Sequence, residues 1–60
     1  MGFIQTDKVL EQLPRGTQVV RVYVAFEGDT RVIVRLPNEA FERRYTVAFE
    51  GDYPKIKEMP

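Results

Sequence analysis

Apolar and polar residues alternate along the middle of the chain, and this alternation predicts β-strands. Successive side chains of a strand point to opposite faces, so one set meets the core and the other meets water. Similar patterns predict four strands, at 18–27, 30–36, 44–50 and 53–58. In the first strand the residues expected on the core face are Val20, Val22, Val24 and Phe26.

The tripeptide Glu-Gly-Asp stands at 27–29 and again at 50–52, and it predicts two hairpins. Glycine reaches φ > 0 without a steric penalty, which tight hairpin turns require. A two-residue loop of Gly51 and Asp52 pairs Val47 with Ile56 on the core face. In both hairpins we expect the glycine to serve the turn and not a ligand.

The register of the first hairpin is open to two interpretations. A two-residue loop pairs Val24 with Ile33 and turns the arginines of the second strand toward the core face. A three-residue loop over 28–30 pairs Val24 with Val34 and keeps those arginines in water. We predict the longer loop, because a slip of one residue sends every side chain to the opposite face.

Two short helices are predicted beside the strands. The first covers 7–13 and is capped by Thr6 or Asp7. Its apolar stripe is Val9, Leu10 and Leu13. The second is a single turn over 39–42, capped by Asn38, which offers its phenylalanine to the core. The expected fold is α+β and mostly β, a small four-stranded antiparallel sheet in the order α-β-β-α-β-β.

The two hairpin segments repeat one another at an offset of 23 residues. The segment Arg21-x-x-Val24-Ala25-Phe26-Glu27-Gly28-Asp29 recurs as Arg44-x-x-Val47-Ala48-Phe49-Glu50-Gly51-Asp52. Two unrelated hairpins would share turn residues but would not need six identical neighbours, so we predict a duplication. The repeat units are 15–37 and 38–60, within a single domain over 1–60.

The composition argues against catalysis and against a metal centre. The chain holds no cysteine and no histidine, so it lacks the usual zinc ligands and the commonest nucleophile and base. The acidic residues of the two hairpin tips are of the type that binds calcium or magnesium, but no EF-hand spacing is present. We therefore expect no enzyme activity, no catalytic residue, no metal and no cofactor.

The chain shows no sign of export or of membrane contact. The N-terminus lacks the basic patch and apolar stretch of a signal peptide, and no run of 18 apolar residues occurs. We expect a cytoplasmic protein with no membrane partner.

Nine basic residues balance nine acidic ones, but the strand pattern separates them. The residues expected on the water-facing side of the sheet are Arg21, Tyr23, Arg31, Arg35, Arg44, Lys55 and Lys57. A basic face with an aromatic ring is typical of nucleic-acid binding, which is the alternative function that this pattern predicts. The simpler interpretation is a solvated face, with Tyr23 and Arg35 as a cross-strand pair.

Self-association is the leading expectation. A chain of 60 residues buries only about 60% of the surface that its unfolded form exposes, and no disulfide is available here. The apolar run of Val32, Ile33 and Val34 would be buried on both faces if a second copy covered one of them. We predict a non-catalytic interaction module that forms a homo-oligomer and binds another protein, through Ile33 with its neighbours, apolar helix residues or an open strand edge.

Overall fold

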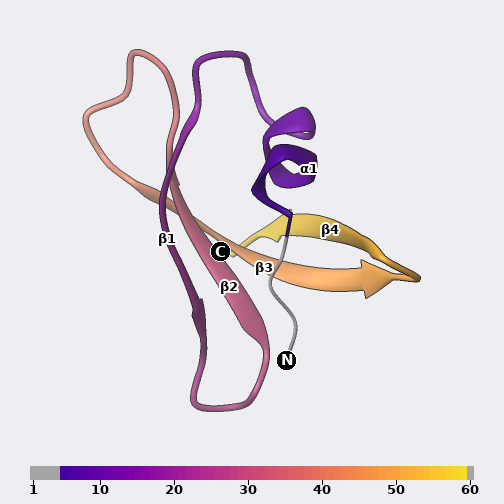
Figure 1. Cartoon of the computed structure of the whole chain (residues 1–60). Helices are drawn as coiled ribbons and strands as arrows, with labels where there is room; N and C mark the ends of the chain where they lie inside the picture. Colours follow the sequence, from indigo (N-terminus) through magenta and orange to yellow (C-terminus); the bar gives the residue numbers. More distant parts are fainter. Residues whose placement is uncertain (1–4, 60) are drawn as a thin grey trace.

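The computed structural model describes residues 5–59, so the ends of the expected domain, residues 1–4 and Pro60, lie outside it. Its elements are α1 (Thr6–Glu11), β1 (Gln18–Val24), β2 (Thr30–Arg35), β3 (Arg43–Glu50) and β4 (Tyr53–Glu58). The strands pair antiparallel in the order β1-β2-β3-β4 (Figure 1). The predicted class, a small four-stranded antiparallel sheet that is mostly strand, is confirmed.

The helix α1 is shorter than expected. It begins after Gln5, whose carbonyl accepts hydrogen bonds from the amides of Lys8 (3.0 Å) and Val9 (3.3 Å), and no side chain caps it. The expected capping by Thr6 or Asp7 is therefore wrong. The helix ends at Glu11, two residues before the expected end at 13.

The second expected helix, and with it the order α-β-β-α-β-β, is not found. Residues 36–42 form a turn in which the amide of Glu39 donates to the carbonyl of Leu36 (3.3 Å). Asn38 has φ of +66°, the left-handed conformation that asparagine tolerates, whereas a helix N-cap needs an extended one. Phe41, expected in the core, is exposed.

The second hairpin folds as predicted. Glu50 faces Tyr53 across a two-residue loop, and Val47 pairs with Ile56. Gly51 has φ of +61°, as a tight turn with glycine at its first central position requires.

The first hairpin has the predicted loop length at a different place. The amide of Ala25 donates to the carbonyl of Asp29, and the amide of Gly28 donates back to the carbonyl of Ala25, both at 2.8 Å. The loop is therefore 26–28, two residues earlier than expected, with Gly28 at φ of +95°. Val24 pairs with Thr30 and not with Val34. Val32 and Val34 nevertheless lie on the same face as Val24, as the longer loop predicts.

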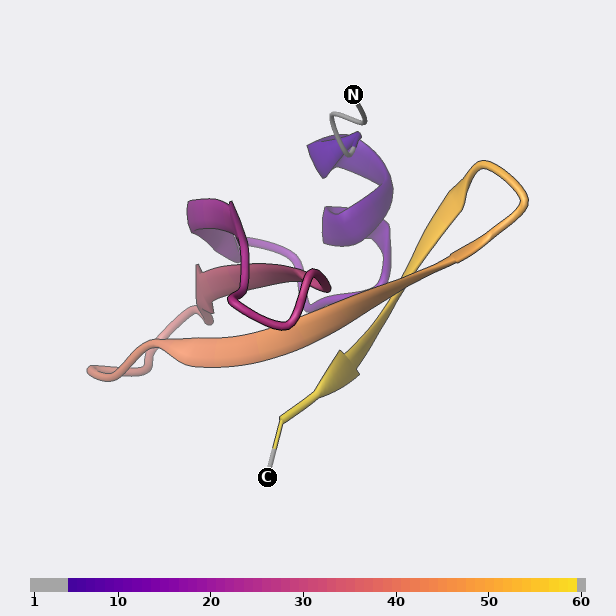
Figure 2. The same ribbon diagram turned by 90° about the horizontal axis from the view of Figure 1, so that it is seen from below.

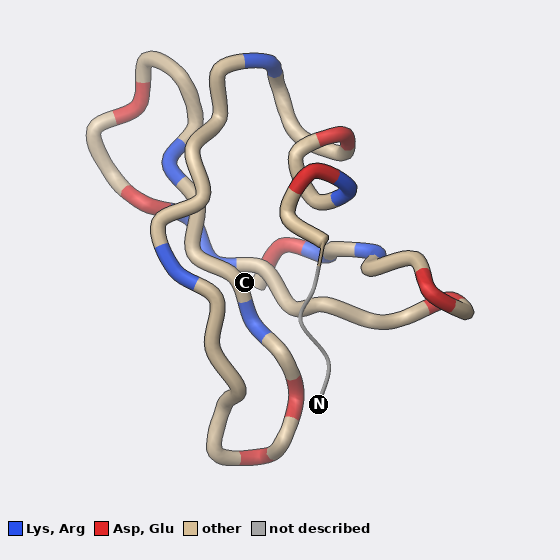
Figure 3. Tube along the Cα trace, viewed as in Figure 1, with Lys and Arg blue, Asp and Glu red and all other residues tan. Residues whose placement is uncertain are grey.

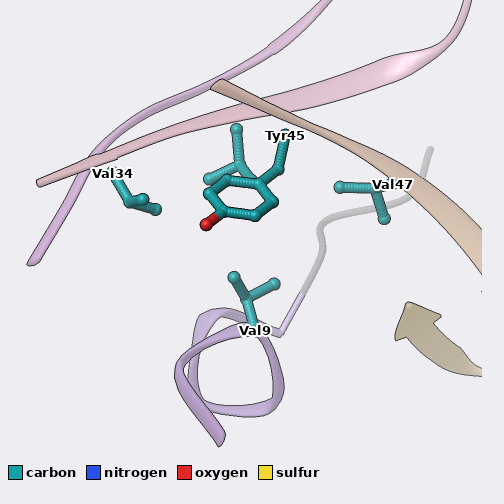
Figure 4. Packing of buried hydrophobic residues seen from close by; sticks show 5 residues of the cluster. Val9, Val34, Tyr45 and Val47 are labelled. Carbon is teal, nitrogen blue, oxygen red and sulfur yellow. The ribbon is translucent and has the colours of Figure 1, made fainter. Parts of the chain in front are cut away.

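The core lies between α1 and one face of the sheet, the helix face (Figure 2). Val9 of α1 points at the ring of Tyr45 on β3, with Val34 and Val47 on either side (Figure 4). The remaining contacts come from Val32, Leu13, Val19 and Ile56. Burial raises the pKa of the Tyr45 phenol, because the charged form is poorly solvated there.

Strand β1 contributes less to this core than its pattern predicts. The register shifts between Val19 and Arg21, so a bulge at Val20 brings Val19 to the core in its place. The residues predicted as the core face of this strand are all exposed: Val20, Val22, Val24 and Phe26. These side chains are exposed because α1 is too short to cover them: a helix of six residues is only about 9 Å long.

Candidate functional site

The strand registers place all seven residues of the predicted basic surface on one side of the sheet, which we call the outer face. Tyr23, Arg31 and Lys57 lie in one cross-strand row, and Arg21 and Arg44 lie in the next. Arg35 and Lys55 complete the set through the alternation of β2 and β4. The outer face is opposite the helix face, so α1 does not cover it.

The aromatic ring of the outer face has a different partner from the one expected. Tyr23 pairs with Arg31 across the strands, so the expected pair of Tyr23 and Arg35 is wrong. The guanidinium of Arg21, two residues along the same strand, lies 5.4 Å from the centre of the Tyr23 ring. A cation over an aromatic ring is stabilising at this distance.

Two cations of the outer face are held by carboxylates. The Nε of Arg31 lies 2.8 Å from Oδ2 of Asp29 and its Nη2 lies 3.4 Å from Oε1 of Glu27. The hydrogen bond from Arg31 lowers the pKa of the Asp29 carboxyl. The Nη2 of Arg35 lies 3.4 Å from Oε2 of Glu42. These pairs weaken the positive potential that the residue types alone suggest.

A third arginine ties the linker to the last strand. The Nε of Arg43 lies 2.9 Å from Oε1 of Glu39, and its Nη1 lies 2.8 Å from Oε2 of Glu58. These two carboxylates raise the pKa of the guanidinium further above its ordinary range. Arg43 thus works as a structural clamp between 36–42 and β4.

Acidic residues gather at the hairpin tips and in the linker, while the basic residues of the sheet lie along the strands (Figure 3). The two hairpin tips point in different directions in Figure 1, so their carboxylates do not converge. Within residues 5–59 no three acidic side chains form a group that could hold a metal ion.

The three residues expected for self-association separate in the structure. Val32 and Val34 are fully buried in the core and offer no surface to a second copy. Ile33 faces outward, half-buried, in the row between Arg21 and Arg44. Of the three, Ile33 is thus the one that a second copy can contact, and larger apolar exposure lies on β1, where Val24 is 68% exposed.

The two edges of the sheet differ. On β4, Pro54 has no amide hydrogen, and its carbonyl accepts a hydrogen bond from Nε2 of Gln12 (2.8 Å). The next outward amide, that of Ile56, donates to Oε1 of Gln12 (3.0 Å). One side-chain amide thus occupies the middle of this edge. Sequence patterns did not reveal Gln12, because it lies 42 and 44 residues from the groups it bonds.

The β1 edge is open by comparison. Ala25 bonds across to Asp29, and alternate residues of an antiparallel strand direct their backbone groups outward. The outward residues are therefore Val22 and Val24, and no side chain in residues 5–59 bonds to their backbone. Their side chains are 38% and 68% exposed.

Comparisons with known protein families, with curated proteins and with solved structures found no match. Among the described residues, no helix has the length and apolar character needed to cross a membrane.

Proposed function

We propose that the protein is a non-catalytic interaction module that self-associates and binds another protein. The observation that carries the proposal is the apolar surface of β1 and its loop, where Val20, Val22, Val24 and Phe26 are all exposed. An exposed strand edge with apolar side chains is a site for pairing with another chain. Four large apolar side chains exposed within seven residues of sequence favour an interaction site here.

The arrangement of the helix supports this reading. Among residues 5–59, the largest fully buried side chains are those of Val9, Val32, Val34 and Pro54. Beyond the helix, Val24 on β1 and Phe49 on β3 are exposed although both belong to the helix face. A partner that covers this part of the sheet adds the burial that a short chain lacks.

Light scattering after size exclusion, over a dilution series, tests self-association. Val24→Lys is expected to weaken the association at least about tenfold, because burying an unpaired charge is costly. Ile33→Lys on the outer face is the matched substitution and should have the smaller effect, since Ile33 is already half-buried. A chain that stays monomeric up to high micromolar concentration would refute the proposal.

A second function, nucleic-acid binding through the outer face, is favoured by one observation. The strand registers gather six cations and the ring of Tyr23 on the face opposite the helix face. Such surfaces contact phosphates and stack bases. Arg21 and Arg44 have no carboxylate partner within residues 5–59, which leaves them available for phosphates.

Titration of labelled DNA and RNA at low salt tests this second function. Phosphate contacts by Arg21, Arg44 and an Arg35 released from Glu42 predict a slope of log affinity against log salt of about −2.7 on duplex DNA, and Arg35→Ala should reduce it by about one. The absence of saturable binding at micromolar protein would leave the interaction module as the one proposal.

We also propose that the two hairpins arose by duplication of one unit, 15–37 and 38–60. The support is the identity of Val24–Asp29 with Val47–Asp52 and the matching arginines 23 residues apart. The last position of the second unit, Pro60, is outside the described residues.

A further inference from the structure

We propose that self-association joins the β1 edges of two copies as antiparallel strands, with the two-fold axis at Tyr23. This inference rests on the proposed function and names its partner, a second copy of this chain. It follows from three features of the β1 edge: its backbone, its side chains and the contrast with β4.

The backbone of β1 offers a short regular segment. The bulge at Val20 bounds it on one side, and the pair of Ala25 and Asp29 bounds it on the other. Between them, Val22 and Val24 direct their amides and carbonyls outward. With the axis at Tyr23, Val22 lies opposite Val24 of the second copy, and each of these two pairs exchanges two hydrogen bonds.

The side chains of this segment are self-complementary. On the helix face the exposed Val22 and Val24 meet the same two valines of the second copy, which adds apolar contact. On the outer face Tyr23 meets Tyr23 of the second copy in a pair without direct backbone bonds, where side chains approach closely. The only charged residue of the segment, Arg21, lies opposite Ala25, about 13 Å along the strand from its own copy.

The blocked edge of β4 determines that the assembly closes. An open-ended fibre would need β1 of one copy to pair with β4 of the next, but Pro54 has no amide hydrogen, and Gln12 already bonds to the carbonyl of Pro54 and the amide of Ile56. Pairing of β4 with itself about Ile56 would also place Lys55 opposite Lys57 of the second copy, and like charges directly opposite are destabilising. The β1 edge is left to pair with itself, which gives a closed dimer.

Disulfide trapping tests the register, because the chain has no cysteine of its own. In Tyr23→Cys the two Cα atoms are expected about 4.5 Å apart, within the range of disulfides, which is about 4.4–6.8 Å. In Val22→Cys and in Val24→Cys the like residues are offset by two positions and lie about 8 Å apart. Lys57→Cys on β4 is the control for random collision.

The expected result is that Tyr23→Cys forms the covalent dimer at least about tenfold faster than the other three single variants. The double variant V22C/V24C keeps the tyrosine and should also cross-link, because residues 22 and 24 face each other across the axis. In the unmodified chain, amide exchange at Val22 and Val24 should slow at concentrations where the dimer forms.

The outcomes separate the two proposals. A monomer by light scattering would overturn both the proposed function and this inference. A dimer in which position 23 cross-links no faster than 22, 24 or 57, and in which the double variant stays unlinked, would overturn the inference alone and leave self-association through another surface.

Discussion

The segments Val24–Asp29 and Val47–Asp52 have the same six residues but different structures. In the second segment β3 continues to Glu50 and turns on two residues. In the first segment β1 ends at Val24, and the loop takes in the phenylalanine and glutamate that are strand residues in the other copy. The six residues therefore do not determine their own conformation.

The difference comes from the residues that follow. After Gly51, the core residues Pro54 and Ile56 are three and five positions on, which suits a two-residue loop. After Gly28, the core residues Val32 and Val34 are four and six positions on. A two-residue loop there would turn both valines to the outer face, so the hairpin adopts three loop residues instead. The burial of core residues in the strand after the turn therefore determines the number of loop residues.

The largest expected difference is between the two equivalent valines. Val47 is 8% exposed and lies in the core, whereas Val24 is 68% exposed. Val47→Ala should lower the free energy of unfolding by about 2 kcal/mol through lost burial and a cavity. Val24→Ala should change the unfolding of the single chain little and weaken association instead. Urea unfolding at low protein concentration measures the first effect, and equal losses in the two variants would contradict the comparison.

The two hairpins differ next in how their outer strands are held. Gln12 bonds to the backbone of β4 at two points, and nothing comparable reaches β1 among the described residues. Gln12→Ala should lower the free energy of unfolding by about 1 to 2 kcal/mol, at about 1 kcal/mol for each bond lost. Glu11→Ala, at the exposed last residue of α1 next to Gln12, is the matched control. The prediction fails if the two variants unfold at the same urea concentration.

The glycines should behave alike despite the different loops. Gly28 and Gly51 both have positive φ, and a β-carbon on either would meet open space, so only backbone conformation opposes substitution. Replacing either by valine should cost about 1 kcal/mol or more. Replacement by asparagine, which tolerates positive φ, should cost less and serves as the control. Thermal unfolding of the four variants measures this, and no change in either valine variant would contradict a turn there.

Alternation along the strands was enough to predict the sheet, the second hairpin and the members of the outer face. These features depend on neighbours within one strand or one tight turn, and the sequence contains that information locally. The correct face of Val32 and Val34 also followed from local pattern, because burying arginine in their place is costly.

The features that patterns did not reveal depend on contacts between distant segments. The bulge at Val20 depends on how β1 pairs with β2. The exposure of Val24 follows from where a short helix ends. The left-handed Asn38 replaces the expected helix, since the linker must reverse the chain within seven residues. The blocked edge of β4 could not be predicted for the same reason, because Gln12 bonds to β4 from the other end of the chain.

The smallest expected effect concerns the aspartates that follow the two turn glycines, Asp29 and Asp52. Asp29 bonds to Arg31, which lowers its pKa, whereas the residue at the matching place after Asp52 is Pro54 and cannot form such a pair. A carboxyl whose pKa is lower in the folded chain stabilises the fold above its unfolded value of about 3.9, and that contribution is lost as the pH falls through the folded value. Both groups are exposed, so the effect on stability is small.

In a carboxyl NMR titration, Arg31→Gln should raise the midpoint of Asp29, whereas Arg21→Gln removes the same charge from the outer face and should leave it nearly unchanged. Equal shifts in the two variants would show that the general field of the face, and not the hydrogen bond, sets the titration of Asp29.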